Sequence, residues 1–292
     1  MSTDSDTTNG SQAEAPVALP AHARERLAEM RERKLFSSDL SVSEFLLLQQ
    51  AGFEPLGLVM GSSIYQIRTV RPNASICAEE LTDFTHSLND ARQLAMNRLE
   101  EEAHALGADG VVGVKLNVNL HAFGKQIAEF IAIGTAVRHK AGGDFRNQHG
   151  KPFTSDLSGQ DFWTLLHTGW RPVGLVMGNC AYYVGPLATT GYARSPDNTE
   201  LPEFTHAMYD AREEAMERLQ AEAEDLRAEG IVGVQIRHDA HAWAGSLGST
   251  VTDFRGEFLE FFVLGTAVIR FAEASPLARA TLCLRADLGG EP

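Results

Sequence analysis

The sequence predicts an α+β protein with two tandem ββαββ-type repeats, each an antiparallel sheet packed by one long helix. Three observations support this fold class. Residues 84–114 recur at 204–234 without a gap and with more than half of the positions identical. Apolar residues in both copies recur three or four positions apart, which is the spacing of one helix face. Segments of alternating apolar and polar residues follow each helix, as expected for strands with one exposed face.

The composition is that of a globular protein with excess negative charge. The chain has 292 residues, is 43% hydrophobic and carries a formal net charge of −14. This length can bury one or two cores, and the acidic surface disfavours nucleic acid and anionic membranes as partners. The start of the chain lacks the basic and apolar segments of a signal peptide. Cys77, Cys180 and Cys283 form no CxxC pair, so we expect a cytoplasmic protein without disulfides.

The first half of the chain contains the first repeat and a long lead-in. We divide it into a disordered tail at 1–18, a helical linker at 19–38 with its helix over 21–35, and repeat 1 at 39–139. Ser41 and Glu44 match a capping box that opens a short helix. The remaining elements follow as strands at 57–61 and 63–70, a long helix at 82–106 ended by Gly107, and strands at 111–123 and 129–137.

The second half repeats this order after a glycine-containing linker at 140–155. Repeat 2 covers 156–271 and opens with Ser158 and Asp161 at the same capping spacing. GLVMG recurs at 174–178, the long helix at 202–226, and the last two strands at 231–243 and 260–268, with a longer hairpin loop at 244–256 and a tail at 272–292. One helix per sheet leaves apolar surface uncovered, so we expect the repeats to pack on each other and on other chains.

Several motifs in both repeats resemble the YbjQ-like family, which is also labelled as heavy-metal-binding domains. They are Ala91-Arg92, residues 105–109 (ALGAD), 111–114 (VVGV) and 134–137 (GTAV), with counterparts at 211–212, 227–229, 231–234 and 265–268. The resemblance implies a small α+β fold that assembles into ring-shaped pentamers, and it implies little chemistry. The family's Gly-Gly-Arg-Ser segment before the long helix is missing here. No metal ligand is carried over from the family.

The duplication constrains any ring. Whole two-repeat chains cannot close a ring of five repeats. Five chains would supply ten repeats, in one ring or in two stacked rings, and otherwise the stoichiometry departs from five. We therefore predict a homo-oligomer, with a pentamer of two-repeat chains as one possible form.

The candidate chemistry lies at the start of the long helices. His86 and Asp90, and likewise His206 and Asp210, are four residues apart and therefore share one helix face. An imidazole and a carboxylate could each bind a divalent metal such as zinc or copper, with further ligands from a neighbouring chain. The alternative is a surface His–Asp pair near a helix N-terminus, where the aspartate interacts favourably with the helix dipole. The adjacent Thr85 has no packing role that the pattern explains.

Two further histidines and two arginines also occur in both repeats. His121 and His241 follow the VGV strands, where each could be a metal ligand or a general base, or a polar side chain of an exposed sheet face. Arg92 and its counterpart Arg212 fall on the apolar helices, where a salt bridge to Glu102, to Glu222 or across a subunit boundary is expected.

No nucleotide-binding or nucleophilic-enzyme motif is present. The chain has no GxGxxG, no Walker lysine and no Gly-x-Ser-x-Gly elbow, and GLVMG is interpreted as a close-packed strand. The leading hypothesis is a non-enzymatic, ring-forming scaffold or binding protein. The alternatives are a divalent heavy-metal-binding protein, which would use His86, Asp90, His206 and Asp210, and an enzyme with an inter-subunit site.

Overall fold

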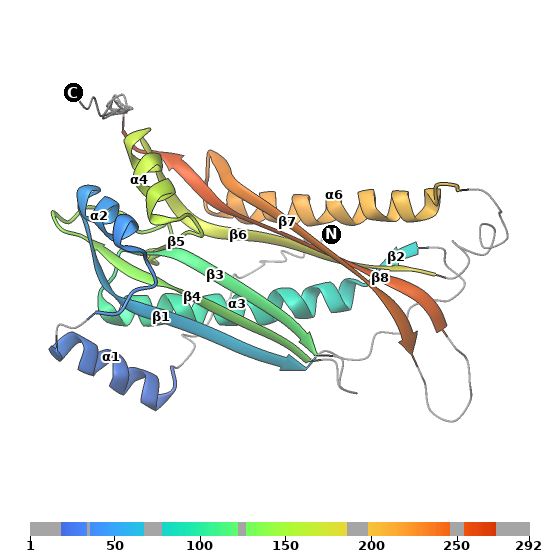
Figure 1. Ribbon diagram of the computed structural model, residues 1–292, viewed down its shortest axis with the longest axis horizontal. Helices are drawn as coiled ribbons and strands as arrows, with labels where there is room; N and C mark the ends of the chain where they lie inside the picture. The colour runs from blue at the N-terminus through green and yellow to red at the C-terminus, as the bar shows by residue number, and fades with distance from the viewer. Residues whose placement is uncertain are drawn as a thin grey trace, which may run out of the picture.

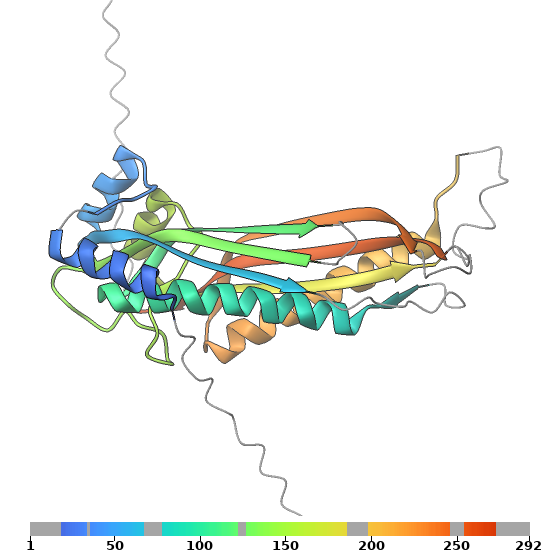
Figure 2. The same ribbon diagram turned by 90° about the horizontal axis from the view of Figure 1, so that it is seen from below.

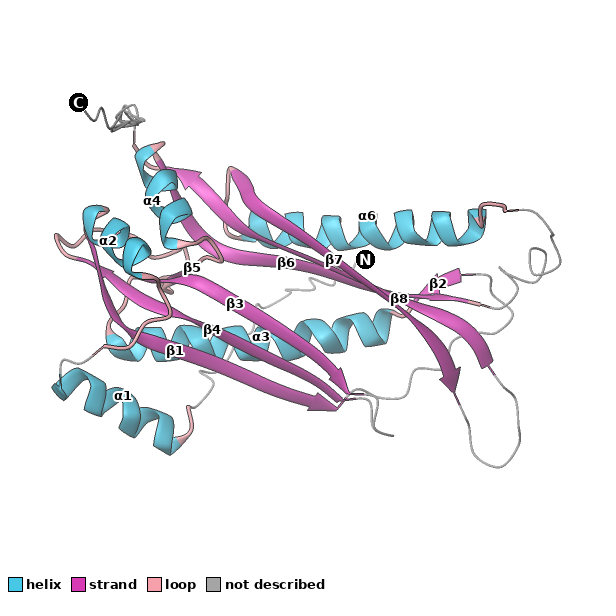
Figure 3. Cartoon of the chain, viewed as in Figure 1, coloured by secondary structure: helices cyan, strands magenta, loops and turns pink. Residues whose placement is uncertain are grey.

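The predicted fold class is confirmed by the computed structural model, which describes residues 19–33, 36–66, 78–121, 127–185, 198–245 and 254–272. Two four-stranded sheets lie side by side in an elongated molecule (Figures 1 and 3), and each sheet is packed by one long helix. Both long helices lie on the same side of the strands (Figure 2). The predicted disordered tail at 1–18 and residues 273–292 of the predicted C-terminal tail fall outside the described residues.

Repeat 1 follows the predicted order closely. Its elements are α2 (Val42–Gln50), β1 (Phe53–Gln66), β2 (Ala78–Glu80), α3 (Thr82–Leu106), β3 (Gly110–His121) and β4 (Ile127–His139). The capping box at Ser41 is confirmed. The Ser41 hydroxyl accepts the Glu44 backbone N–H, and the Glu44 carboxylate accepts the Ser41 backbone N–H. Gly107 ends α3 with a φ of 76°, a left-handed conformation that glycine adopts without steric cost.

Repeat 2 has the same long elements. They are α4 (Gly159–His167), β6 (Trp170–Val184), α6 (Pro202–Asp225), β7 (Gly230–Gly245) and β8 (Phe254–Arg270). The strands β7 and β8 extend into the segment 244–256 that was predicted as a loop, and residues 246–253 between them lie outside the described residues. In both repeats the two strands predicted before the long helix form a single strand in the described residues.

Each sheet contains one short strand that comes from outside its own repeat. The strand orders are β1-β4-β3-β5 and β2-β6-β8-β7. β5 (Phe153–Thr154) comes from the predicted linker and pairs in parallel with β3 of repeat 1, whereas β2 of repeat 1 pairs antiparallel with β6 of repeat 2. The boundary between the repeats is therefore a reciprocal exchange of strands rather than a free linker.

The helix–sheet contacts explain the repeated GLVMG motif. In repeat 1 a Cβ on Gly61 would overlap the carbonyl group of Ala95 in α3, and in repeat 2 a Cβ on Gly178 would overlap that of Ala215 in α6. Each glycine therefore lets its strand approach the helix backbone directly, and the interpretation of GLVMG as a close-packed strand is confirmed.

The predicted first helix is present as α1 (Ala21–Arg33), which packs on α3. Leu27 is buried, Arg31 donates to the Ala105 carbonyl at 3.2 Å, and Arg26 forms an ion pair with Glu102 at 2.6 Å. The predicted helical linker is thus a structural part of repeat 1. No helix in the described residues is both long and apolar enough to span a membrane.

Candidate functional site

The four helix residues predicted as metal ligands are all exposed. His86 and Asp90 lie on α3, and His206 and Asp210 lie at the equivalent positions of α6. In the described part of the chain, no three His, Cys, Asp or Glu side chains converge as a metal site would require. The described residues of one chain therefore do not supply a complete donor set around either pair.

His121 is the last residue of β3 and His241 lies in β7. Their side chains are outside the described part of the structure, so their role stays a prediction.

Arg92 joins the two repeats. Its side chain is almost fully buried and donates to both carboxylate oxygens of Glu222 in α6 and, at 2.7 Å, to Asn89. Glu222 in turn accepts the Met177 N–H of β6 at 2.9 Å. Of the three partners expected for Arg92, the structure selects Glu222, and it gives the arginine a structural role in the contact between repeats.

Thr85 has a clear structural role that the sequence did not suggest. This residue is buried beside β6, where its hydroxyl accepts the Ala181 N–H and its carbonyl accepts the Asn179 amide, both at 3.0 Å. The expectation that Thr85 lacks a packing reason is therefore corrected. The helix pattern could not show this contact, because the partner strand is almost 100 residues away.

Apolar side chains of both repeats form a single cluster across the same contact. Val114 and Leu116 of β3 belong to it together with Leu175 and Met177 of β6. Edge-to-face packing of Phe84 on Phe258, with ring centroids 5.0 Å apart, extends the cluster towards the far end of α3. The contact between the repeats is thus a continuous hydrophobic core.

Burial also governs the titratable groups near the contact. Burial raises the pKa of the Cys180 thiol to about 12, so Cys180 is not a thiolate nucleophile at neutral pH. Arg218 ties α6 to repeat 1 through Glu80 at 2.7 Å. Burial also raises the pKa of Glu100, although Lys151 lies 3.1 Å away and opposes this shift.

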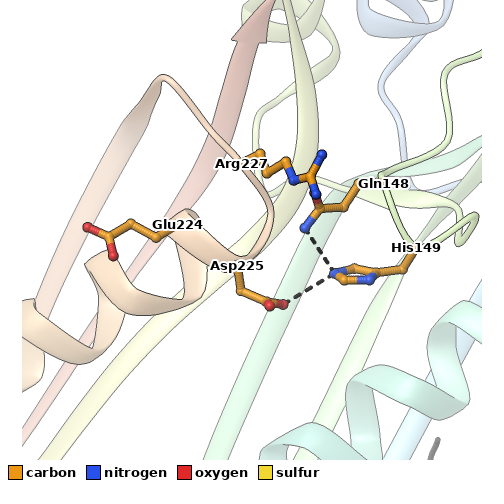
Figure 4. Close-up of a pocket in the computed structure, with 5 residues that line it drawn as sticks. All are labelled: Gln148, His149, Glu224, Asp225 and Arg227. Carbon is orange, nitrogen blue, oxygen red and sulfur yellow. Dashed lines mark hydrogen bonds and ion pairs between the residues drawn. The ribbon is translucent and has the colours of Figure 1, made fainter. Parts of the chain in front are cut away.

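A shallow polar pocket lies where the segment between the repeats meets the end of α6 (Figure 4). Its lining is Gln148, His149, Glu224, Asp225 and Arg227, and His149 lies 3.2 Å from Asp225 and 3.3 Å from Gln148. These side chains are largely exposed and hold the connecting segment to the helix. The pocket contains none of the predicted site residues.

Comparison with known proteins identifies the repeated unit. A family model described as "Putative heavy-metal-binding" matches residues 51–140 and 194–270. A Mycobacterium tuberculosis protein named "Encapsulin nanocompartment protein Rv1762c" is 43% identical over 258 residues, which are 87% of this chain and 92% of that protein.

Shorter relatives correspond to a single repeat. A UPF0145 protein of Helicobacter hepaticus is 37% identical over 90 residues, which are 30% of this chain and 85% of that protein. A UPF0145 protein of Halorubrum lacusprofundi is 39% identical over 90 residues, which are 29% of this chain and 84% of that protein. The chain belongs to the YbjQ-like family, with two copies of the family's domain in tandem.

Proposed function

We propose that the protein is a non-enzymatic scaffold that assembles from identical chains joined head to tail. The observation that carries this proposal is a difference in burial between equivalent residues. Side chains that are buried between repeat 1 and repeat 2 have exposed counterparts at the two outer ends of the chain. The outer end of repeat 2 therefore corresponds to the repeat 1 side of the internal contact. The outer end of repeat 1 corresponds to the repeat 2 side.

The outer end of repeat 2 exposes apolar residues of β7. Ile236 is 52% exposed, whereas its counterpart Leu116 is 6% exposed because repeat 2 covers it. Val234 is likewise exposed, and its counterpart Val114 is buried. Exposed side chains of this kind in adjacent positions are typical of an interaction surface.

The outer end of repeat 1 exposes apolar residues of β1. Ile64 is 72% exposed, whereas its counterpart Ala181 is completely buried under α3. Met60 is also exposed, and its counterpart Met177 is buried in the cluster shared by the repeats. The two outer surfaces are thus complementary in the same way as the two surfaces that already meet inside the chain.

Charge complementarity points to the same arrangement. Arg212, the counterpart of Arg92, is exposed. Its contacts in the described residues stay on its own helix, where Glu213 lies 3.7 Å away and the Tyr209 ring centroid 5.1 Å away. Glu102, the counterpart of Glu222, accepts the Met60 N–H at 3.0 Å just as Glu222 accepts that of Met177. Arg212 of one chain and Glu102 of the next would reproduce the buried pair of the internal contact.

A contact between two different surfaces is heterologous, and it produces a ring when the rotation closes. The family resemblance favours a closed ring, and five chains with ten repeats are the stoichiometry that we propose. The Mycobacterium tuberculosis relative has the same two-repeat length, and its name refers to a compartment assembly. This supports a role in assembly over a role in catalysis.

The test is the native mass of the purified chain and of two surface variants. We expect an oligomer for the unmodified chain and a monomer for both Ile236→Asp and Ile64→Asp, because each variant places a charge in one half of the contact. A mixture of the two variants should form a dimer, since one unmodified contact remains possible. Phe271→Asp, at a residue 45% exposed and outside both surfaces, is the matched control. A monomeric unmodified chain would refute the scaffold.

The alternative function is divalent metal binding by His86, Asp90, His206 and Asp210. The equivalent exposed placement of the two pairs favours it, and a second chain would have to supply the missing ligands. Under the scaffold hypothesis we expect less than one zinc or copper ion per chain in metal analysis of the assembled protein. Stoichiometric metal that disappears in the double variant His86→Ala, His206→Ala would establish the alternative instead.

A further inference from the structure

We infer that residues 36–38 of one chain add as a parallel strand to the free edge of β7 in a second copy of the chain. This inference rests on the proposed head-to-tail assembly and assigns it a specific docking segment. We call residues 36–38 the N-terminal strap. The internal equivalent of this strap is the segment that contains β5.

The two segments are nearly identical in sequence. Residues 34–41 read KLFSSDLS and residues 151–158 read KPFTSDLS, so they differ at two positions only. Both are followed by a short helix with a serine cap, α2 or α4. Each segment therefore leads into its own repeat in the same way.

The internal segment shows how such a strap docks. The Phe153 N–H donates to the Asp109 carbonyl at 3.1 Å, and the Ser155 N–H donates to the Val111 carbonyl at 3.0 Å. The Ser155 carbonyl accepts the Val114 N–H at 2.9 Å. The segment that precedes repeat 2 thus closes the edge of β3 in repeat 1 through backbone hydrogen bonds.

A glycine creates the space for the aromatic ring of this strap. The Phe153 ring lies against Gly110, at which a Cβ would overlap three of the ring atoms. The ring is fully buried, and it packs on Phe53 and Phe162 with centroids 6.4 and 5.8 Å away. Phe153 therefore anchors the strap in the core of the preceding repeat.

The N-terminal strap is held on its own repeat as the internal one is. The hydroxyl groups of Ser38 and Thr135 are 3.1 Å apart, and Thr135 donates to Asp39 at 3.1 Å. Ser155, Thr266 and Asp156 form the same arrangement in repeat 2 at 3.0 and 2.6 Å. What differs is the exposure of the ring. Phe36 stacks on Phe45 of α2 with centroids 5.7 Å apart, as Phe153 stacks on Phe162, but Phe36 is 42% exposed because no sheet in the described residues covers it as repeat 1 covers Phe153.

The matching acceptor is present at the other end of the chain. In the described residues β7 pairs with β8 alone, so its outer edge is free. Gly230 is the counterpart of Gly110, and a Cβ placed there would meet only a Val268 methyl group at 3.8 Å. The space that the Phe153 ring fills in repeat 1 is open in repeat 2. Phe36 of a second copy has the size and position to fill it.

A cross-linking experiment on the full chain tests this contact. Cys77→Ser and Cys283→Ser remove two of the natural cysteines, and the third, Cys180, is buried and unreactive. In this background, Phe36→Cys combined with Gly230→Cys should form disulfides between chains on mild oxidation, because paired strands bring their Cβ atoms within bonding range. We expect roughly tenfold more cross-linked chains than in a control that pairs Phe36→Cys with Phe271→Cys.

A second variant tests the energetic role of the ring. Phe36→Ala should raise the concentration at which the chains assemble by about tenfold or more, as expected for the loss of an aromatic anchor. An oligomeric protein with no interchain cross-link and an unchanged assembly midpoint in Phe36→Ala would overturn the strap contact and leave the scaffold intact. A cross-link within one chain would overturn the second copy as the partner. A chain that is monomeric throughout would overturn both proposals.

Discussion

The two repeats have the same elements and nearly the same motifs, yet equivalent residues are in different environments. Leu116 is covered by repeat 2 whereas Ile236 faces solvent, and Phe153 is buried whereas Phe36 is exposed. The apolar character of these positions is therefore not explained by the core of a single repeat. Leu116 and Phe153 lie in the contact between the repeats, whereas Ile236 and Phe36 lie at the two outer ends of the described chain.

Polar residues show the same difference. Thr85 accepts hydrogen bonds from the Ala181 backbone and the Asn179 side chain of β6. Its counterpart Thr205 is half-exposed and donates to Glu200 at 2.8 Å in its own repeat. The same side chain thus bridges two repeats in one copy and makes a local contact in the other. Comparing matched substitutions in the two copies separates what a residue does for its repeat from what it does between repeats.

The largest difference is expected at the straps. Phe153→Ala should lower the free energy of unfolding by about 3–5 kcal/mol, because it leaves a cavity in the aromatic cluster. Phe36→Ala should lower it by less than about 1 kcal/mol at concentrations below assembly. Urea unfolding of both variants in dilute solution measures this difference. Equal losses would show that the stacking of Phe36 on Phe45 within its own chain contributes as much as the burial of Phe153.

A smaller difference is expected at the arginines. Arg92→Ala should cost about 2–3 kcal/mol of unfolding free energy, less than for a fully buried pair, because water can still reach part of Glu222. Arg212→Ala should change the unfolding free energy by no more than about 0.5 kcal/mol, but should weaken assembly. Thermal unfolding and native mass, measured on both variants, distinguish the two effects. A monomer stability equally sensitive to both arginines would contradict the comparison.

A third substitution concerns α1. Arg26 donates to Glu102, the carboxylate that Arg212 of a neighbouring chain would reach. Arg26→Ala should therefore favour assembly, by about two- to fivefold in the midpoint concentration. The arginine of this pair is exposed although Glu102 is buried, and we expect such an ion pair to contribute about 0.5–1 kcal/mol. Sedimentation at several concentrations measures the shift, and Arg31→Ala on the same helix is the control. Weaker assembly of Arg26→Ala would show that α1 supports the contact.

The smallest effect is expected at Glu100, whose counterpart is Gln220. Burial raises the pKa of Glu100 above its ordinary value of 4.5, so the folded state binds the proton more tightly than the unfolded state. Its contribution favours folding at low pH and is lost as the pH rises through the folded pKa. Glu100→Gln should raise the free energy of unfolding by less than about 1 kcal/mol at pH 7. It should also flatten the pH dependence of this free energy above about pH 4.5. Gln220→Glu, at an exposed position, should change neither quantity in urea titrations over pH 4–8.

The sequence predicted what depends on local periodicity. The bounds of α3, the capping box at Ser41 and the close approach of GLVMG to the helix all follow from the spacing of apolar residues, caps and glycines. Short β2 and β5 were missed because two or three residues show no periodicity. Repeated phenylalanines at 36 and 153 are the signal that could have revealed the straps.

The site residues were harder to predict. The His86–Asp90 pair was singled out because no packing reason was visible, and the described residues add no third ligand to it. Arg92 was expected to form a salt bridge, and Thr85 was left unexplained. Both contact β6 or α6, which lie in the other repeat, and no pattern within one helix reports a partner so distant in sequence.

β5 follows repeat 1 in the chain but pairs with β3 of repeat 1, so the sheet of repeat 1 is completed late during synthesis. Translation produces β3 before residues 153–154, so the edge of β3 stays open until the ribosome has released the beginning of repeat 2. β7 is made after this segment, and in the described residues no part of the same chain pairs with its outer edge. A newly made chain thus leaves the ribosome with an open strand edge, which favours uncontrolled association until a partner covers it. In the proposed assembly, a second copy of the chain would cover this edge.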